Sequence, residues 1–332
     1  MKILLTGGTG QVGFELQRSL CLLGSVLAPS RRELDLTNPK AVEHWLAQHR
    51  PDLIVNAAAY TAVDKAEDEP ELARRLNAGL PAQLAAYSAA GGQRLVHYSS
   101  DYVYPGSGDS PWQESDATGP LNVYGQTKLE GDKAIQASGC PHLIFRTSWV
   151  YSARGHNFMK TMLRLGRERE ALKVVSDQVG APTPARLIAQ VTAQALHALP
   201  LTSEAPASPE GAHRSPLTPD QPAGRSHLMP HGTYHLAPSG ETSWHGFARE
   251  ILRLAAAMGE TLTIAPDRVA AIPTAAYPTP AKRPLNSRLD CQALEHALGI
   301  TLPSWQAQLA LTLREEYLTS KAFTIDPAGH QP

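Results

Sequence analysis

Residues 2–13 decide the fold of this chain, and they read K-I-L-L-T-G-G-T-G-Q-V-G. The first five form a short apolar run, which is typical of a parallel strand buried on both faces. A helical pattern follows the glycines, with an apolar side formed by Val12, Leu16, Leu20 and Leu23. Strand, glycine-rich loop and helix in this order are the context in which G-x-x-G-x-x-G predicts a phosphate-binding loop.

Each glycine of this loop has an expected role. We expect Gly7 to permit the tight turn, Gly10 to let backbone approach a pyrophosphate, and Gly13 to allow close helix–strand packing. The amino terminus of the helix then offers unpaired N–H groups to the anion. The loop therefore predicts a dinucleotide site, and the alternative is an ordinary strand-to-helix turn.

The choice of cofactor depends on the residues after a second expected strand at 26–29. They are Ser30, Arg31 and Arg32. A site selective for NAD usually has an acidic residue here, which binds the ribose 2′-hydroxyl. Because arginines suit a 2′-phosphate, we predict a preference for NADPH over NADH, with NADH use still possible. The alternative is that both arginines are solvated surface charges.

Strands and helices alternate through residue 150. This predicts an α/β fold of Rossmann type, in which a doubly wound parallel sheet is covered by helices on both faces. The further elements expected there are strands at 53–55, 94–98 and 142–145 and helices near 71–90 and 121–138. Asp35 and Leu36 are expected near the adenine. The small residues of 56–61 would let a cofactor lie against backbone.

The domain boundaries follow changes in composition. Residues 1–150, with later returning segments, are expected to form the NAD(P)-binding domain. Residues 151–199 and 232–320 are expected to form a smaller α/β region that binds the substrate, including helices at 185–199 and 244–257. Residues 200–231 are rich in Pro, Ser, Thr, Ala and Gly and cannot bury enough apolar surface, so we predict a disordered insertion there. Residues 321–332 are expected to be a flexible tail.

A histidine repeat lies at the end of that insertion. His227, His231 and His235 recur every four residues, which is a spacing that metal ligands on a helix can have. Pro230 and Gly232 would break such a helix. The sequence therefore argues against a metal site at these histidines.

The composition excludes several classes of function. The 332 residues carry a formal net charge of −1 and 6% aromatics, which gives no electrostatic footprint for nucleic acid. No apolar stretch approaches the ~20 residues that span a bilayer, and the N-terminus lacks the apolar region of a secretory signal. Cys21, Cys140 and Cys291 are widely spaced without C-x-x-C, which fits buried thiols in a reducing cytoplasm.

Proton-transfer chemistry is indicated by Tyr124 and Lys128 in Y-G-Q-T-K. Four residues apart on a helix, they share one face with Cβ atoms roughly 5–6 Å apart. A phenol titrates near pH ~10, and an ammonium nearby favours the phenolate. Ser100 and Asp101 follow the fourth strand at the sheet edge where ligands bind, so the serine is expected to hydrogen-bond the oxygen that gains charge. The alternative is a chance Tyr–Lys match on an exposed helix.

A basic loop near the C-terminus is a second candidate contact. Residues 279–288 read T-P-A-K-R-P-L-N-S-R and include Arg283 and Arg288. A proline-stiffened loop of this charge can contact an anionic substrate; equally, it can be a plain connector.

Together these motifs resemble the extended short-chain dehydrogenase/reductase superfamily and, within it, the dTDP-4-dehydrorhamnose reductase family. The matching stretches cover nearly the whole chain outside 200–231 and are Gly7–Glu15, Asn56–Asp64, Tyr98–Gly106, Val123–Lys128, Arg146–Tyr151, Asp177–Thr183 and residues 283–289. The resemblance implies reduction of the C4 ketone of dTDP-4-dehydro-β-L-rhamnose to dTDP-L-rhamnose. That is the last step in making this nucleotide sugar for cell-surface polysaccharide such as the O-antigen of lipopolysaccharide.

The resemblance also implies roles for individual residues. Tyr124 is expected as proton donor, Lys128 as its partner and ribose ligand, and Ser100 as the donor to the developing alkoxide. Asp101 and Trp149 match sugar-contacting positions, and the arginines at 283 and 288 are expected at the pyrophosphate. Cofactor-lining positions are matched by Gly10, Gln11, Val12, Asp35, Leu36, Ala59, Tyr60, Thr61 and Tyr98. To these the loop patterns add Gly7, Gly13, Ser30 and Arg31.

Some members of this family are dimers with Mg²⁺ held by glutamates at the interface. Glu15 is kept here, but Arg186 stands at a helix start where an acidic residue would be expected. A cation at that position would repel Mg²⁺. We therefore expect no metal-bridged dimer, although a homodimer of another kind stays possible.

Two alternatives have specific discriminating residues. A 4,6-dehydratase of the superfamily typically has Asp-Glu after the Ser/Thr, whereas here Asp101 is followed by Tyr102. A 4-epimerase keeps NAD⁺ tightly bound, whereas the arginines after Ser30 suit a dissociable NADPH. A non-catalytic dinucleotide-binding regulatory subunit would not need the Tyr–Lys pair, so its presence favours an enzyme.

Overall fold

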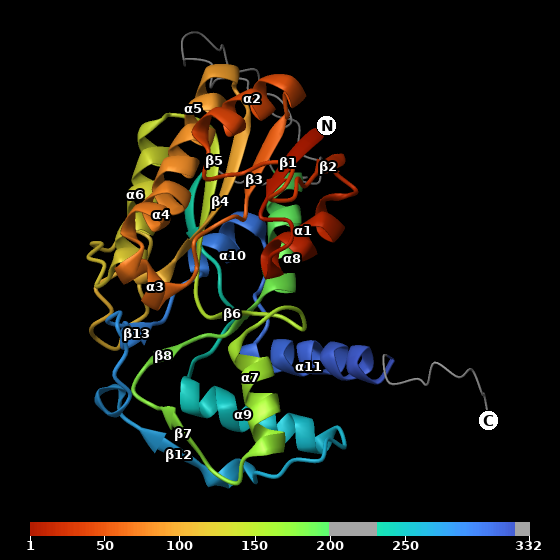
Figure 1. The fold of residues 1–332 in the computed structure, drawn as a ribbon, viewed down its shortest axis with the longest axis vertical. Coiled ribbons are helices and arrows are strands. Elements are labelled where there is room, and N and C mark those ends of the chain that lie inside the picture. The colour runs from red at the N-terminus through yellow and green to blue at the C-terminus, as the bar shows by residue number, and fades with distance from the viewer. Residues whose placement is uncertain (199–230, 323–332) are drawn as a thin grey trace, which may run out of the picture.

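The first strand of the chain lies within a six-stranded parallel sheet, as the sequence predicts (Figure 1). This computed structural model describes residues 1–198 and 231–322. The predicted insertion, apart from its last residue, and the predicted tail beyond residue 322 lie outside the described residues. The strands in spatial order are β10 (Gly232–His235), β5 (His142–Thr147), β4 (Arg94–Ser100), β3 (Leu53–Asn56), β1 (Lys2–Thr6) and β2 (Ser25–Leu27).

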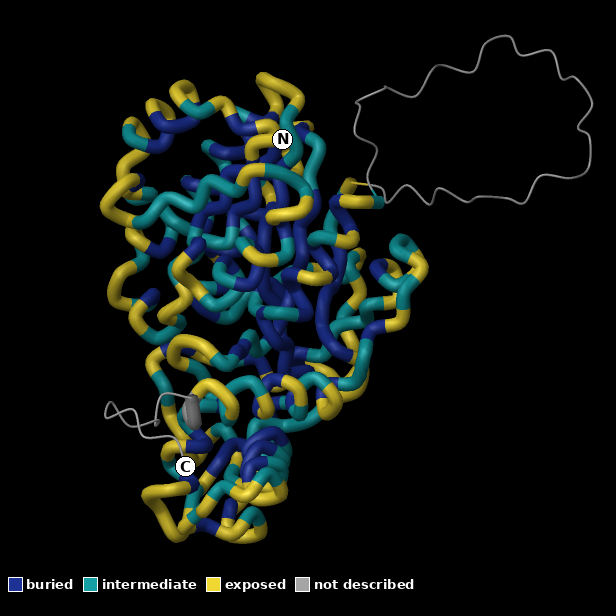
Figure 2. The backbone as a smooth tube through the Cα atoms, turned by 90° about the vertical axis from the view of Figure 1, so that its right-hand side faces the viewer, coloured by how far each residue is buried: buried dark blue, intermediate teal, exposed yellow. Residues whose placement is uncertain are grey.

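Successive residues of β1 pack into two different cores. Ile3 and Leu5 belong to the core with α1 (Gln11–Leu20), α8 (Ala185–His197) and α10 (Gln292–Leu298). Leu4 belongs to the core with α2 (Pro39–His49), α5 (Leu80–Gly91) and α6 (Val123–Ala137). Because side chains alternate between faces, a strand covered on both sides is apolar at successive positions, as at Ile3, Leu4 and Leu5. Figure 2 shows buried segments gathered inside a more exposed shell.

A third core builds the smaller unit that Figure 1 shows below the sheet. Its helices are α7 (Phe158–Glu168), α9 (Trp244–Ala257) and α11 (Trp305–Ala322), beside the parallel pair β7 (Leu172–Val175) and β12 (Val269–Ile272). Short strands connect the two units: β6 (Val150–Tyr151) pairs with β9 (Thr183–Pro184), and β8 (Val179–Gly180) lies between β11 (Thr242–Ser243) and β13 (Asn286–Ser287).

Several element boundaries differ from the sequence-based expectation. The predicted helix near 71–90 consists of α4 (Pro70–Arg74), a π-helical turn η1 (Arg75–Gly79) and α5, preceded by α3 (Val63–Asp68). Strand β4 continues past the predicted end at residue 98 to Ser100. Helix α2 was not predicted, although Asn38 caps it by accepting from the backbone of Lys40 and Ala41. The predicted helix at 244–257 is confirmed.

Candidate active site

A cleft of about 970 Å³ opens at the carboxyl ends of the sheet strands. Its walls come from both units, from the glycine-rich loop to α9. Most of the residues singled out from the sequence line it: Gly7, Gly10, Gln11, Val12, Arg31, Asp35, Leu36, Ala59, Tyr60, Thr61, Tyr98, Ser100, Asp101, Tyr124, Lys128 and Trp149. Its volume is in the range of ligand-binding clefts.

The glycine-rich loop makes one end of this cleft. Gly7 has a φ of 71°, and a Cβ there would lie 2.6 Å from the backbone of Ala57, so only glycine fits. A Cβ on Gly13 would lie 2.1 Å from the Gly7 carbonyl oxygen. Gly13 therefore supports close helix packing and does not itself line the described cleft. Gly10 precedes α1 and has no capping side chain, which leaves the helix N–H groups facing the cleft.

Tyr124 stands in the first turn of α6, deep in the cleft. Asn122 caps this helix by accepting from the Gly125 N–H at 2.8 Å. Burial raises the pKa of Tyr124 to about 12, against a hydrogen bond with Ser100 that lowers it. The phenol is therefore protonated at neutral pH, which is the state that a proton donor needs.

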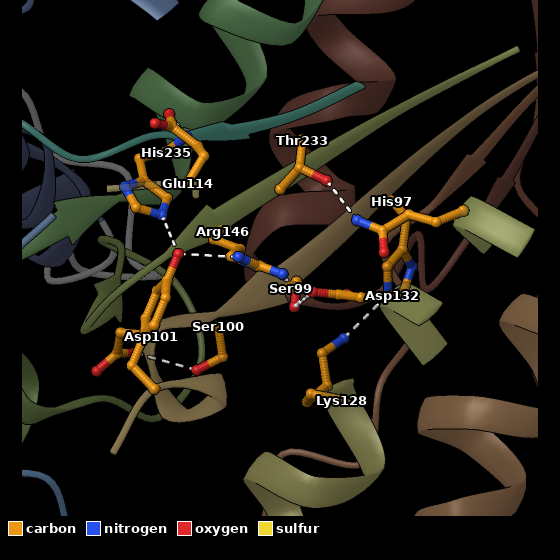
Figure 3. Close-up of polar contacts among 12 residues, drawn as sticks. His97, Ser99, Ser100, Asp101, Glu114, Lys128, Asp132, Arg146, Thr233 and His235 are labelled. Atoms are coloured by element: carbon orange, nitrogen blue, oxygen red, sulfur yellow. Dashed lines mark hydrogen bonds and ion pairs between the residues drawn. The ribbon is translucent and has the colours of Figure 1, made fainter. Parts of the chain in front are cut away.

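Lys128 lies one helical turn further on and is fully buried. Its ammonium donates to the Tyr98 carbonyl at 2.6 Å. It also lies 3.3 Å from Nε2 of His97 (Figure 3). Burial lowers the pKa of Lys128 to about 8, although the charge of Asp132 raises it. We predicted that Lys128 would lower the pKa of Tyr124; in the structure that pKa is raised, because burial dominates and the ammonium turns to Tyr98.

A buried polar network holds the helix of Lys128 against the sheet (Figure 3). Asp132, on the same helix, accepts from Ser99 at 2.9 Å and from Nε of Arg146 at 3.1 Å. Arg146 continues to the Tyr104 hydroxyl at 2.8 Å, which lies 2.6 Å from Nε2 of His235. Paired charges of this kind restrict the position of α6 relative to β4 and β5.

Ser100 ends β4 and faces Tyr124. Its hydroxyl accepts from the Tyr102 N–H at 3.1 Å and donates to Asp101 at 3.0 Å (Figure 3). Burial raises the pKa of Asp101 to about 6, against hydrogen bonds from Ser287 and Ser100 that lower it. The structure thus brings Ser100, Tyr124 and Lys128 together from a strand end and a helix.

The opposite wall is aromatic. Trp149 stacks on Trp244, with ring centroids 3.8 Å apart and planes at 16°. Trp244 was not identified from the sequence as a cleft residue, because a tryptophan at the start of an amphipathic helix is normally interpreted as a core residue. Nothing in its local pattern indicates the cleft. A loop also missed, with Gly155, His156 and Asn157, lines the cleft where Asn157 donates to Gln11 at 2.9 Å.

Besides Gly13, three residues predicted to bind ligand do not line the described cleft: Ser30, Arg283 and Arg288. The Ser30 N–H donates to Glu33 at 2.7 Å. Arg283 is paired with Asp64 at 2.8 Å, and Arg288 with Glu241 at 2.5 Å. Both guanidinium groups are thus already neutralised by carboxylates that the sequence did not identify as partners.

The residues at Glu15 do not fit a Mg²⁺ site. Nε of Arg186 lies 3.1 Å from Glu15, and Nη2 of Arg186 lies 2.7 Å from Glu315. A guanidinium already bridges the two carboxylates, so the donor set for a divalent cation is occupied. Among the described residues no group of three or more His, Cys, Asp or Glu side chains is arranged to hold a metal. Within the same residues, no helix has the length and apolarity that crossing a bilayer requires.

Comparison with known proteins agrees with this arrangement. The chain matches the RmlD substrate binding domain family over residues 1–208 and 220–318. It is 48% identical to dTDP-4-dehydrorhamnose reductase of Salmonella typhimurium (strain LT2) and 46% identical to that of Escherichia coli (strain K12), each alignment covering 96% of this chain and 99% of the relative.

The solved structures that this chain resembles include two dTDP-4-dehydrorhamnose reductases. The dTDP-4-dehydrorhamnose reductase of Clostridium acetobutylicum matches with a TM-score of 0.80 at 34% identity, and that of Bacillus anthracis, in complex with NADP, with 0.78 at 30%. Each alignment covers 95% of this chain and 99% of the other. The UDP-glucose 4-epimerase of Thermus thermophilus, at 18% identity, shares the fold. The chain belongs to the dTDP-4-dehydrorhamnose reductase family and is an NAD(P)H-dependent oxidoreductase.

Proposed function

We propose that this chain reduces the C4 ketone of dTDP-4-dehydro-β-L-rhamnose to dTDP-L-rhamnose, with NADPH as the preferred hydride donor. The observation that carries the proposal is that Tyr124, Lys128 and Ser100 line one cleft together with the glycine-rich loop. The names of relatives at 46–48% identity support the choice of substrate. The product would serve the synthesis of a cell-surface polysaccharide.

The fit of a nicotinamide dinucleotide rests on residues of this chain. The glycine-rich loop and the start of α1 would hold the pyrophosphate, and Arg31 would hold a ribose 2′-phosphate. Lys128 has one ammonium hydrogen left after its bonds to Tyr98 and His97, and this hydrogen would donate to the nicotinamide ribose. When bound, NADPH supplies the hydride to the ketone carbon.

Residues of the chain itself would transfer the proton to the substrate. As the ketone oxygen gains negative charge, the Tyr124 hydroxyl delivers its proton to that oxygen. Ser100, which donates to Asp101 in the free chain, turns its hydroxyl toward the same oxygen and stabilises its charge. The phenolate that is left behind then takes up a proton again, which its raised pKa favours. Asp101 and Trp149 would bind the sugar.

One assay tests the proposal. Purified protein is mixed with NADPH and dTDP-4-dehydro-L-rhamnose, and loss of the reduced nicotinamide and appearance of dTDP-L-rhamnose are followed together. We expect one product per NADPH oxidised, with the reaction dependent on the ketone. Net conversion without NADPH consumption would favour an epimerase, release of water from a dTDP-hexose a dehydratase, and binding without turnover a regulatory subunit. Any of these would refute the reductase.

A further inference from the structure

The backbone of Trp149 is unusual. Its φ is 49°, in the left-handed region that bulky side chains rarely adopt. Among the described residues only one other non-glycine residue, Arg50, has a positive φ, and it lies at the end of α2. Left-handed conformations persist only where surrounding contacts impose them, and they are found at ligand-binding sites more often than elsewhere.

Contacts on Trp149 come from elements far away in sequence. The Thr183 N–H donates to its carbonyl at 3.2 Å, which ties β6 to β9. Gly180 lies against the indole: a Cβ there would come within 3.2 Å of the ring. The face of the ring is covered by Trp244 at 3.8 Å. The indole therefore has little freedom to leave the cleft wall.

Trp244 is itself held on several sides. It is the first residue of α9, where Ser243 caps the helix by accepting from the Gly246 N–H at 3.1 Å. Its indole N–H donates to Gln178 at 3.2 Å. Phe158 packs against it, with ring centroids 4.6 Å apart. These contacts fix the plane of Trp244 relative to the smaller unit.

We propose that Trp244 is a positioning residue, which holds Trp149 in its left-handed conformation and so sets the affinity for the sugar nucleotide. Both indoles line the cleft that contains Tyr124 and Ser100. An indole fixed in one orientation binds a sugar or base face without first losing rotamer freedom. The inference rests on the proposed function, in which Trp149 contacts the substrate.

A double-mutant cycle tests it. We expect Trp244→Ala to raise KM for dTDP-4-dehydro-L-rhamnose about tenfold, with kcat and KM for NADPH changed by less than about twofold. Trp244→Phe retains a flat ring and should restore most of the affinity. In a Trp149→Ala background, Trp244→Ala should add almost nothing, because the residue through which it acts is gone. Effects on KM that multiply would overturn the inference.

Circular dichroism gives a readout that needs no substrate. Two indoles stacked at 3.8 Å should give an exciton couplet, which either single alanine variant should abolish. Trp305→Ala is the matched control: it also removes an indole at a helix start in the same core, outside the cleft. It should keep both couplet and KM. A couplet that survives in Trp244→Ala overturns the inference. Absence of turnover by wild type with an intact couplet would instead refute the proposed function and the claim on KM.

Discussion

The ammonium nitrogen of Lys128 lies 2.6 Å from the backbone carbonyl of Tyr98, and Lys128 is fully buried. Burial lowers the pKa of Lys128 from 10.5 to about 8. Between those values the unfolded chain holds more protons at this site than the folded chain does. The contribution of Lys128 to the free energy of unfolding therefore increases as pH rises through this window.

This relationship predicts the behaviour of Lys128→Met, which removes the ionisable group. Relative to that variant, wild type should gain up to about 3 kcal/mol of stability between pH ~8 and ~10.5, because the cost of burying an ammonium disappears. Urea unfolding of both proteins at several pH values measures it. If the free energies of unfolding of the two proteins change with pH in parallel, burial does not lower the pKa of Lys128.

Tyr124→Phe removes the proton donor and keeps the ring. We expect kcat to fall by ~10²–10⁴-fold while NADPH binding is retained, because only the transition state loses a contact. Single-turnover rates and cofactor titration separate the two. Tyr102→Phe is a neighbouring control, since its ring lies 5.4 Å from that of Tyr124, and it should lose much less. Equal losses in the two variants would remove the special role of Tyr124.

His97→Leu should shift the alkaline limit of activity. His97 is fully buried, and burial first, then the charge of Lys128, holds its pKa well below 6.5, so the ring is neutral. In the tautomer with its proton on Nδ1, its Nε2 accepts from the ammonium. Loss of one hydrogen bond to a charged group should lower the pKa of Lys128 by about one unit. The basic limb of kcat/KM against pH should move by the same amount. His97→Gln, which keeps an acceptor, should move it less; an unmoved limb in His97→Leu contradicts the prediction.

The parts of the site that lie within one element were predictable. Tyr124 and Lys128 share a helix, and spacing alone puts them on one face. Ser100 ends a strand of a parallel sheet, and that edge is common to all its strands. Side chains of a strand alternate between the two faces of the sheet, so the continuous apolar run of β1 predicts that both faces are covered by a core.

The parts of the site that depend on packing between distant elements could not be predicted from the sequence. Trp149 stacks on Trp244 only because α9 packs beside the cleft. Arg283 pairs with Asp64, which is 219 residues away in the sequence. Periodicity predicts which face of an element is buried but not which residue lies opposite. For the same reason the sequence did not identify Asp64 and Glu241 as the ion-pair partners of Arg283 and Arg288.

Arg31→Asp should change cofactor preference. Arg31 is exposed and lines the cleft, and a carboxylate there would repel a 2′-phosphate. We expect kcat/KM for NADPH to fall about 10–100-fold, with little change for NADH. Arg32→Asp makes the same charge change at an exposed position outside the described cleft and should leave the ratio unchanged. If NADH is already preferred by wild type, the assignment of Arg31 to the 2′-phosphate is wrong.

Arg186→Glu should convert an ion-pair cluster into a cation site. Glu15 is 6% exposed in its side chain, and Arg186 bridges it to Glu315. In the variant three carboxylates would face one another, so Tm should fall by roughly 2–6 °C without metal and recover in millimolar Mg²⁺. Thermal unfolding with Mg²⁺ and with EDTA measures this. Arg186→Ala lacks the third carboxylate and should be destabilised but much less sensitive to Mg²⁺. Since the guanidinium already supplies the positive charge, wild type should unfold at one temperature in both buffers, and a Mg²⁺-dependent Tm in wild type would contradict the assignment.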